Sequence, residues 1–285
     1  MKQLFKQWMI GGLAVLLAML VIDTAHAESL RLARIFGDGM VLQRDQAIPI
    51  WGWANPGAKV KVALVGQGDG RGAIATADAD GKWMVRVEGY PTGGTFTLSV
   101  TSGKEQLGLS DILMGDVWVC SGQSNMQWPV QVNLGIHTME VAYSNREVLN
   151  ADYPNIRLYT VPMTTSFVPL DDVVVTDKPM YPGDTPDRLL HWQACSPETV
   201  PSFSSVAYFF GRDMYLANDV PIGLIQTAWG GTLCEAWTSA DTLNKNPDFQ
   251  PVVAQLQTEL RDPAEVQQEY DEAYVAWRQA VDKLD

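Results

Sequence analysis

The sequence predicts an α/β protein in which an antiparallel β-sandwich is followed by an α/β domain with a parallel sheet. Two observations support this. Short β-forming runs separated by turn residues recur over the first part of the chain, and longer apolar runs alternate with a helical pattern over the second. The domain boundaries that follow are 1–27, 28–109, 110–246 and 247–285.

Residues 1–27 have the pattern of a signal peptide. Lys2 and Lys6 precede an apolar stretch over residues 9–22, and Ala25 and Ala27 supply the small residues of a cleavage site. The stretch is too short for a membrane-spanning helix. We therefore expect a soluble mature protein, free of the membrane after cleavage, that is periplasmic or secreted.

Residues 28–109 form the predicted sandwich. Turn residues such as Asn55-Pro56-Gly57 separate its strands at regular intervals, as in antiparallel sandwiches. The predicted strands are LRLARI, IPIWGW, KVKVALV, GAIATA, KWMVRV, TFTLSV and EQLGL.

Residues 110–246 form the predicted α/β domain, because apolar strand-like runs alternate there with an amphipathic helix. The predicted strands cover residues 112–120, 156–161 and 222–228, and the helix covers residues 205–217. The last segment, 247–285, has apolar residues three or four apart and predicts a helix pair. The sequence ends inside this helical pattern.

Composition and cysteine usage limit the classes of ligand. A net charge of −13 would repel a phosphate backbone, so we expect no nucleic-acid partner, whereas neutral or sugar-like ligands stay possible. Cys120, Cys195 and Cys234 lack the CxxC spacing of thiolate metal sites, and no metal is predicted. Cys120 is interpreted as a buried strand residue, and one disulfide among the three is left open.

The stretch WVCSGQSNMQW, residues 118–128, is the candidate nucleophile site. Its apolar half predicts a strand, and Gly122 permits a tight turn after it. Ser124 then projects from the turn, with Gln123 and Asn125 beside it, and backbone N–H groups of a following helix would face the site. Ser121 still completes the strand, so Ser124 is the candidate nucleophile.

The block Gly115-Asp116-Val117-Trp118 followed by CSGQSNM resembles the nucleophile block of the sialate O-acetylesterases, which are hydrolases of the Ser-Gly-Asn-His (SGNH) type. A second block, residues 221–232 followed by Glu235-Ala236-Trp237, resembles the same family, and so does Leu42-Gln43-Arg44. The resemblance implies that Ser124 attacks an acetyl group. It also implies an SGNH-type, flavodoxin-like α/β/α domain, which this chain would carry only in part.

The second block supplies candidate oxyanion donors. Thr232 and Glu235 have the spacing of a capping box, which predicts a helix that begins just after the two glycines. Glycines at a helix N-terminus let backbone amides approach a ligand. We expect the N–H groups of Ser124 and of Gly230 or Gly231 to form the oxyanion hole.

A general base is not evident in the sequence. The resemblance implies a histidine in an Asp-x-x-His block near the carboxyl terminus of the family, and neither this block nor the preceding Gln-Gly-Glu block occurs beyond residues 1–27. His137 and His191, the histidines beyond the signal peptide, are candidate bases only if the fold brings one of them to Ser124. We expect the chain to correspond to the N-terminal part of a longer esterase and to have little activity alone.

The sequence thus predicts a carbohydrate O-acetylesterase that acts through a serine acyl-enzyme on an acetylated carbohydrate and needs no cofactor. An acetyl-xylan esterase is the alternative within the same reaction class. A glycan-binding protein without catalysis is the alternative outside it, and its candidate contacts are Trp51, Trp53, Trp83 and Trp128. The oligomeric state does not follow from the sequence.

Overall fold

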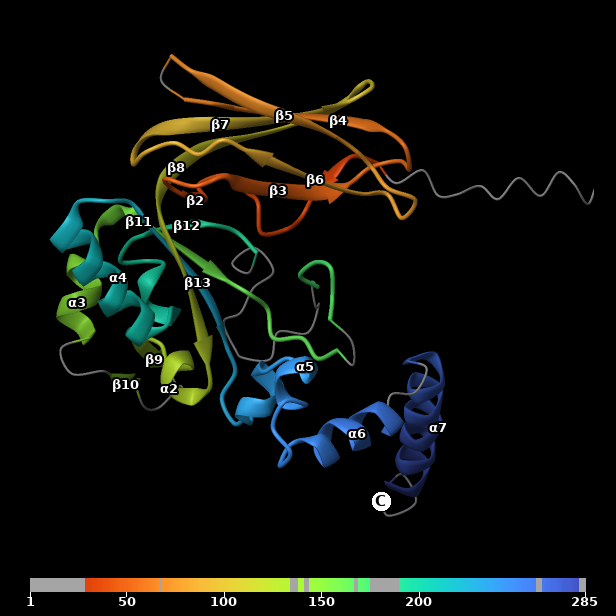
Figure 1. The fold of residues 1–285 in the computed structure, drawn as a ribbon. Helices are drawn as coiled ribbons and strands as arrows, with labels where there is room; N and C mark the ends of the chain where they lie inside the picture. Colours follow the sequence, from red (N-terminus) through yellow and green to blue (C-terminus); the bar gives the residue numbers. More distant parts are fainter. Residues whose placement is uncertain are drawn as a thin grey trace, which may run out of the picture.

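The structure is a computed structural model that describes residues 29–66, 68–133, 138–140, 144–166, 169–174, 190–259 and 263–281. Two layers of antiparallel strands form its amino-terminal part, and a sheet with flanking helices follows (Figure 1). The larger sheet has the order β12-β11-β13-β8-β7-β4-β5, and β2 pairs with β8 outside this path. The predicted α/β class is confirmed.

The two amino-terminal layers enclose one apolar core. One layer is the antiparallel sheet β1-β3-β6, and the other contains β5, β4, β7 and the first half of β8. Residues of β4 and β6 alternate between buried and more exposed positions, so one face of each strand enters the core. The strand bounds are β1 (Arg31–Leu32), β2 (Val41–Gln43), β3 (Ile48–Trp53), β4 (Lys59–Val65), β5 (Gly70–Thr76), β6 (Lys82–Val87) and β7 (Gly93–Ser102).

Strand β8 (Glu105–Gly122) is shared by both parts of the molecule. Its first half pairs antiparallel with β7 as far as Met114, and its second half pairs parallel with β13 from Asp116 onward. Figure 1 shows this strand leaving the amino-terminal layers and entering the region of the helices. The sequence placed a domain boundary between residues 109 and 110, and the chain runs through that position as one strand.

A β-bulge explains why this position looks like a boundary. The β7–β8 register shifts between Phe96 and Leu98, and Asp111 has a φ of 54°. Arg157 of the neighbouring part donates to the Asp111 carboxylate at 2.6 Å, and its own side chain is 9% exposed. A polar residue in left-handed backbone therefore stands inside the strand because a buried guanidinium binds it.

The second half of the molecule is built on parallel pairing of β8, β13 (Ile222–Ala228) and β11 (Tyr153–Thr160), with β12 (Gln193–Cys195) antiparallel at the edge. Helix α4 (Ser205–Asn218) covers one face. It begins at Ser204, whose hydroxyl accepts from the Ala207 amide, and ends at Asp219 with a φ of 53°. The helix lies close to the sheet, since a Cβ on Gly211 would stand 2.7 Å from Leu224.

Shorter elements complete the chain. The predicted carboxyl-terminal helix pair corresponds to α6 and α7, which extend away from the sheets in Figure 1. The described side chains of α7, including Tyr270, Tyr274 and Trp277, are exposed. The remaining elements are α2 (Ser124–Gln127), β9 (Gln131–Asn133), β10 (Thr138–Glu140), α3 (Ser144–Asn150), η1 (Val200–Ser202), η2 (Cys234–Trp237), α5 (Ala240–Leu243), α6 (Gln250–Glu259) and α7 (Pro263–Val281).

The cysteines form no disulfide. Cys120 and Cys195 are buried and Cys234 is exposed, and all three thiols are free. Burial raises the pKa of Cys120 to about 11 and that of Cys195 to about 12, so both stay protonated at neutral pH. The interpretation of Cys120 as a buried strand residue is correct.

Residues 1–27, the predicted signal peptide, lie outside the described residues. Within the described part of the chain, no helix has both the length and the apolar character needed to cross a bilayer.

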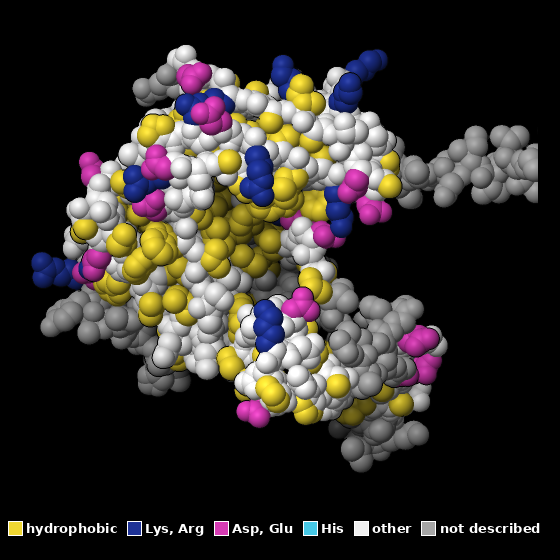
Figure 2. Space-filling model, in the orientation of Figure 1, with side chains coloured by type: hydrophobic (Ala, Val, Ile, Leu, Met, Phe, Trp, Pro, Cys, Tyr) yellow, Lys and Arg dark blue, Asp and Glu magenta, His cyan; other side chains and the backbone are white. Residues whose placement is uncertain are grey.

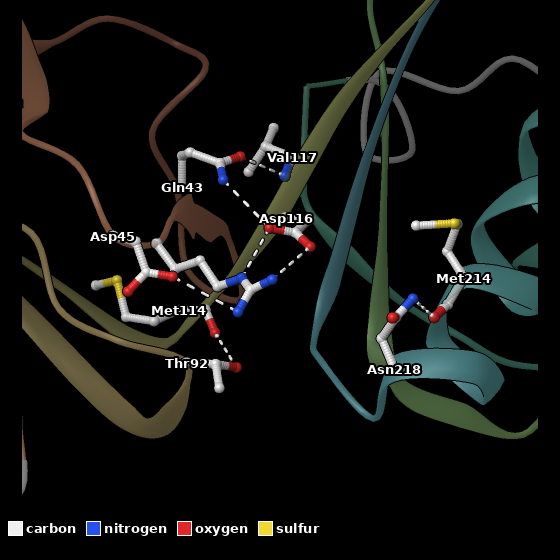
Figure 3. Close-up of polar contacts among 9 residues, drawn as sticks. Gln43, Asp45, Thr92, Met114, Asp116, Val117, Met214 and Asn218 are labelled. Carbon is white, nitrogen blue, oxygen red and sulfur yellow. Dashed lines mark hydrogen bonds and ion pairs between the residues drawn. The ribbon is translucent and has the colours of Figure 1, made fainter.

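A polar cluster fixes β8 where it passes from one part to the other (Figure 3). Arg44 donates to both carboxylate oxygens of Asp116, at 2.9 and 3.2 Å. Gln43 donates to Asp116 at 3.2 Å and accepts from the Val117 amide at 2.9 Å. Leu42-Gln43-Arg44, noted in the sequence for its resemblance, thus holds the strand that leads to Ser124.

We predict that Asp116→Asn lowers the free energy of unfolding by about 1.5 kcal/mol at pH 7, because a charge-assisted pair is lost. The hydrogen bonds from Arg44 lower the pKa of Asp116 below its usual range. This stabilisation is therefore complete above the unfolded-state pKa of about 3.9 and disappears as the pH falls through the lowered folded-state pKa. Urea denaturation between pH 7 and pH 2 measures it.

The matched control is Asp45→Asn, because Asp45 approaches the same guanidinium at 3.5 Å but is 62% exposed. It should change stability little. An equal loss in both variants, or a difference between wild type and Asp116→Asn that persists at pH 2, would contradict the role given to Asp116.

Candidate active site

The turn after β8 presents Ser124 as the first residue of α2. Gly122 adopts a φ of 141°, which favours glycine, and the chain then turns at Gln123 into the helix. The amides of Met126 and Gln127 both donate to the Gln123 carbonyl. The amide of Ser124 is at the first helical position and has no intrahelical acceptor. It therefore remains available to a ligand.

The end of β13 lies beside this turn. The parallel register pairs Gly122 with Ala228, and the Trp229 amide donates to the Gly122 carbonyl at 2.9 Å. A Cβ on Gly230 would lie 3.4 Å from both Cα and Cβ of Ser124. The two sequence blocks thus meet at the carboxyl edge of the parallel strands, where α/β folds place their ligands.

The glycines of this edge differ in what their amides do. The Gly230 N–H already donates to Oε1 of Gln127. Gly231 has a φ of 80°, is exposed, and has open space within 4 Å of the position a Cβ would take. Of the two candidate donors, Gly231 is the one whose amide is not used by another described residue, and its conformation favours glycine.

Gln127 links three segments of the site. Its Oε1 accepts from Gly230 at the end of β13, and its Nε2 lies 3.5 Å from Sδ of Met163, which follows β11. Helix α4 is joined as well, because the Ser205 amide donates to the Trp128 carbonyl at 2.8 Å. Hydrogen bonds therefore hold the turn around Ser124 from both β13 and α4.

The sequence analysis did not predict the buried hydrogen bond between Gln226 and Ser204 that lies beneath this turn. Gln226, which is 7% exposed on β13, accepts from the amide of fully buried Ser204 at 2.9 Å. This bond fixes the start of α4, and the Ser204 hydroxyl also contacts Sδ of Met126 at 3.5 Å. The signal was a glutamine in an otherwise apolar strand, since a buried amide needs a hydrogen-bond partner.

The predicted capping box was wrong. The Thr232 hydroxyl donates to the Trp229 carbonyl at 2.7 Å and accepts from the indole of Trp237 at 2.8 Å. The helical turn that follows is the 3₁₀ segment η2, with Leu233 at its cap and no side-chain cap bond. Thr232 closes the glycine turn instead, and Glu235 lies inside η2, 3.4 Å from the Cys234 thiol.

The remaining predicted residues lie at the rim of the turn. Ser124 is half-buried, Asn125 is exposed, and the Ser124 hydroxyl lies 3.3 Å from Oε1 of exposed Gln123. Ser121 is exposed on β8, ahead of the turn. No group of three or more histidine, cysteine, aspartate or glutamate side chains among the described residues could hold a metal ion.

One of the two candidate bases, His191, is not brought to Ser124. His191 precedes β12, and the sheet order separates β12 from β8 by three strand spacings, roughly 14 Å. His191 is therefore wrong as the base of this site. His137 lies outside the described residues.

We predict that Gln127→Leu exposes the Gly230 amide to solvent exchange. Loss of one hydrogen bond of about 1 kcal/mol should speed that exchange roughly fivefold. Amide exchange followed by NMR measures it, and Gln127→Glu is the control because its carboxylate keeps an acceptor oxygen at the same place. Unchanged exchange in the leucine variant would show that Gln127 does not hold the glycine turn.

Comparison with known proteins identifies relatives of this chain. Sialate O-acetylesterases from Pongo abelii and Homo sapiens are 34% and 33% identical to the chain, over 240 and 237 residues. Each match covers 80% of this chain and 42% of the relative, so the chain spans less than half the length of these relatives. No family model matches the sequence.

A solved structure agrees with these relatives. A carbohydrate acetylesterase from Xanthomonas citri superposes with a TM-score of 0.63 at 33% identity, over 76% of this chain and 44% of that protein. Sequence and fold together show that the matched stretch of this chain is homologous to the sialate O-acetylesterases.

Proposed function

We propose that this chain carries the nucleophile side of a carbohydrate O-acetylesterase and that Ser124 is the nucleophile. One observation carries the proposal: the turn bearing Ser124 and the glycine turn at residues 230–231 meet at the carboxyl edge of two adjacent parallel strands. The names of the relatives, sialate O-acetylesterases and a carbohydrate acetylesterase, support an acetylated sugar as the substrate class.

In the proposed reaction, Oγ of Ser124 forms a bond to the acetyl carbonyl carbon and its proton passes to a base. The carbonyl oxygen becomes an oxyanion, which accepts hydrogen bonds from the amides of Ser124 and Gly231. Collapse of this intermediate breaks the ester bond and releases the sugar hydroxyl, which takes up a proton. Water then hydrolyses the acetyl-serine and releases acetate.

The described residues provide no proton acceptor beside Ser124 for this reaction. His191 is distant from Ser124, and the resemblance implies a histidine in an Asp-x-x-His block, which does not occur in this sequence beyond residue 27. A serine without its base loses on the order of a millionfold in turnover, and the oxyanion donors alone retain about 10³–10⁴ over water. We propose that polypeptide beyond the described residues supplies the base.

The glycan-binding alternative finds less support. Trp53 and Trp83 are buried, and Trp51 packs edge-on against Phe36 with ring centroids 4.7 Å apart. Of the four candidate tryptophans, Trp128 alone has a large exposed fraction, 46%. They therefore form no shared surface on which a sugar could stack.

The cellular location and the absence of a nucleic-acid partner are proposed from the sequence. The charged amino terminus and the apolar stretch after it support export, so we propose a periplasmic or secreted protein. The net charge of −13 supports the proposal that the protein has no nucleic-acid partner. Initial rates on O-acetylated sialic acid and on acetylated xylan would separate the two substrate classes.

We predict that added imidazole, acting as a diffusing base, raises acetate release from an O-acetylated sugar in the wild-type chain. It should recover part of the roughly 10²–10⁴-fold that a positioned base contributes. Ser124→Ala should show only the rate that imidazole gives without enzyme. Acetate release with increasing imidazole measures this.

The matched control is Ser121→Ala, because Ser121 is an exposed serine on the strand just before the turn. It should keep the imidazole-dependent rate. Equal rates in wild type and Ser124→Ala, or a loss in the Ser121 variant as large as in the Ser124 variant, would reject Ser124 as the nucleophile.

A further inference from the structure

Trp237, at the end of η2, is tied to the turn that carries the Gly231 amide. Its indole N–H donates to the Thr232 hydroxyl at 2.8 Å, and that hydroxyl donates to the Trp229 carbonyl at 2.7 Å. Gly231 stands between these two partners in the chain. The indole is therefore fixed beside the glycine turn before any ligand binds, and such preorganisation lowers the entropic cost of binding.

The surroundings of its ring distinguish Trp237 from most other tryptophans. Four tryptophans of the described residues are at least 40% exposed, and two of them, Trp118 and Trp277, pack against neighbouring aromatic rings. Within the described part of the chain, no aromatic ring or arginine packs on Trp237 or Trp128, which are 40% and 46% exposed. Of these two, Trp237 is the one that is bonded to the glycine turn.

An indole held in this way suits the apolar face of a sugar ring. The polar N–H of Trp237 is satisfied by Thr232 and part of its ring faces water, so covering the ring with another apolar surface is favourable. A pyranose has C–H groups on its faces and hydroxyls around its rim. It can cover the indole while its hydroxyls stay in water, so Trp237 offers a stacking platform for a pyranose.

The charge of the surrounding segments favours a neutral sugar over an anionic one. Residues 117–145, 158–177 and 213–244, which contain the two turns of the site and the end of β11, include no lysine or arginine. Glu235 of η2 lies between the glycine turn and Trp237 in the chain. In Figure 2, lysine and arginine side chains lie mainly around the amino-terminal layers, and none is seen over α2. A carboxylate on the sugar would be repelled here and would find no cation in these segments.

We propose that Trp237 holds the sugar of the substrate by stacking, and that this site prefers a neutral O-acetylated pyranose to an O-acetylated sialic acid. The inference rests on the proposed function, because it places the sugar at the same site as the candidate oxyanion donors. A pyranose stacked on the indole lies beside the turn of Gly231, and that turn contacts Ser124 through Gly230. An acetyl group at the rim of the sugar is then presented to both turns, as productive orientation requires.

Stacking can be tested by NMR titration of the indole N–H resonances of this chain with an O-acetylated methyl xyloside as the neutral probe. We expect the Trp237 resonance, identified by its absence in Trp237→Phe, to shift. Trp237→Ala should weaken binding about tenfold, the upper range for one lost stacking contact. Trp237→Phe keeps a ring but loses the bond to Thr232, and it should weaken binding less. Equal losses in the two variants would assign the effect to that hydrogen bond and overturn the stacking role.

The matched control is Trp128→Ala, because Trp128 is equally exposed and follows the helix that begins at Ser124, but its indole is not bonded to the glycine turn. This variant should bind the xyloside as the wild type does. A titration that leaves the Trp237 resonance unmoved would overturn the proposal. So would a loss of binding in Trp128→Ala as large as that in Trp237→Ala.

The charge preference is tested with O-acetylated sialic acid as the anionic probe. At low salt it should bind roughly fivefold more weakly than the xyloside, because its carboxylate is repelled. Glu235→Gln should narrow this difference and leave the xyloside affinity unchanged. Sialic acid that binds as tightly as the xyloside would contradict the preference. These titrations measure binding, whereas the imidazole experiment on Ser124 measures acetate release, so a failure of the one is distinguishable from a failure of the other.

Discussion

The continuity of β8 is the constraint on which the rest of this structure depends. One strand forms antiparallel pairs in the amino-terminal layers and parallel pairs beside the helices, so the two halves share a backbone. The change of partner falls at Gly115, where a Cβ would lie 1.9 Å from the Pro221 carbonyl. Asp116, held by Arg44 and Gln43, then directs the strand toward Ser124.

The path of β8 sets the geometry of the site, and it also shows which parts of the site the described residues lack. The parallel register between β8 and β13 brings a serine turn and a glycine turn together, and Gln127 ties them. Beyond Gly115, the opposite edge of β8 has no strand among the described residues, and they place no base beside Ser124.

The sequence predicted those parts of the fold that short-range patterns specify. The strand at residues 222–228 and the helix predicted over residues 205–217 follow from apolar periodicity. The unbroken β8 could not be predicted, because Asp111 resembles a turn until Arg157 is known to bind it. Thr232 likewise resembled a helix cap, and its role is decided by the Trp229 carbonyl and the Trp237 indole, three and five residues away, whose positions the capping pattern does not give.

The contact between the serine turn and the glycine turn is the central claim. A Cβ on Gly230 would lie 3.4 Å from Cβ of Ser124, near the separation of about 3.5–4.5 Å found in disulfides. Ser124→Cys combined with Gly230→Cys, in a protein that also carries Cys234→Ser, should therefore form a disulfide on mild oxidation, identified by peptide mass spectrometry. A folded protein in which both introduced thiols stay free would contradict the proposed geometry of the site.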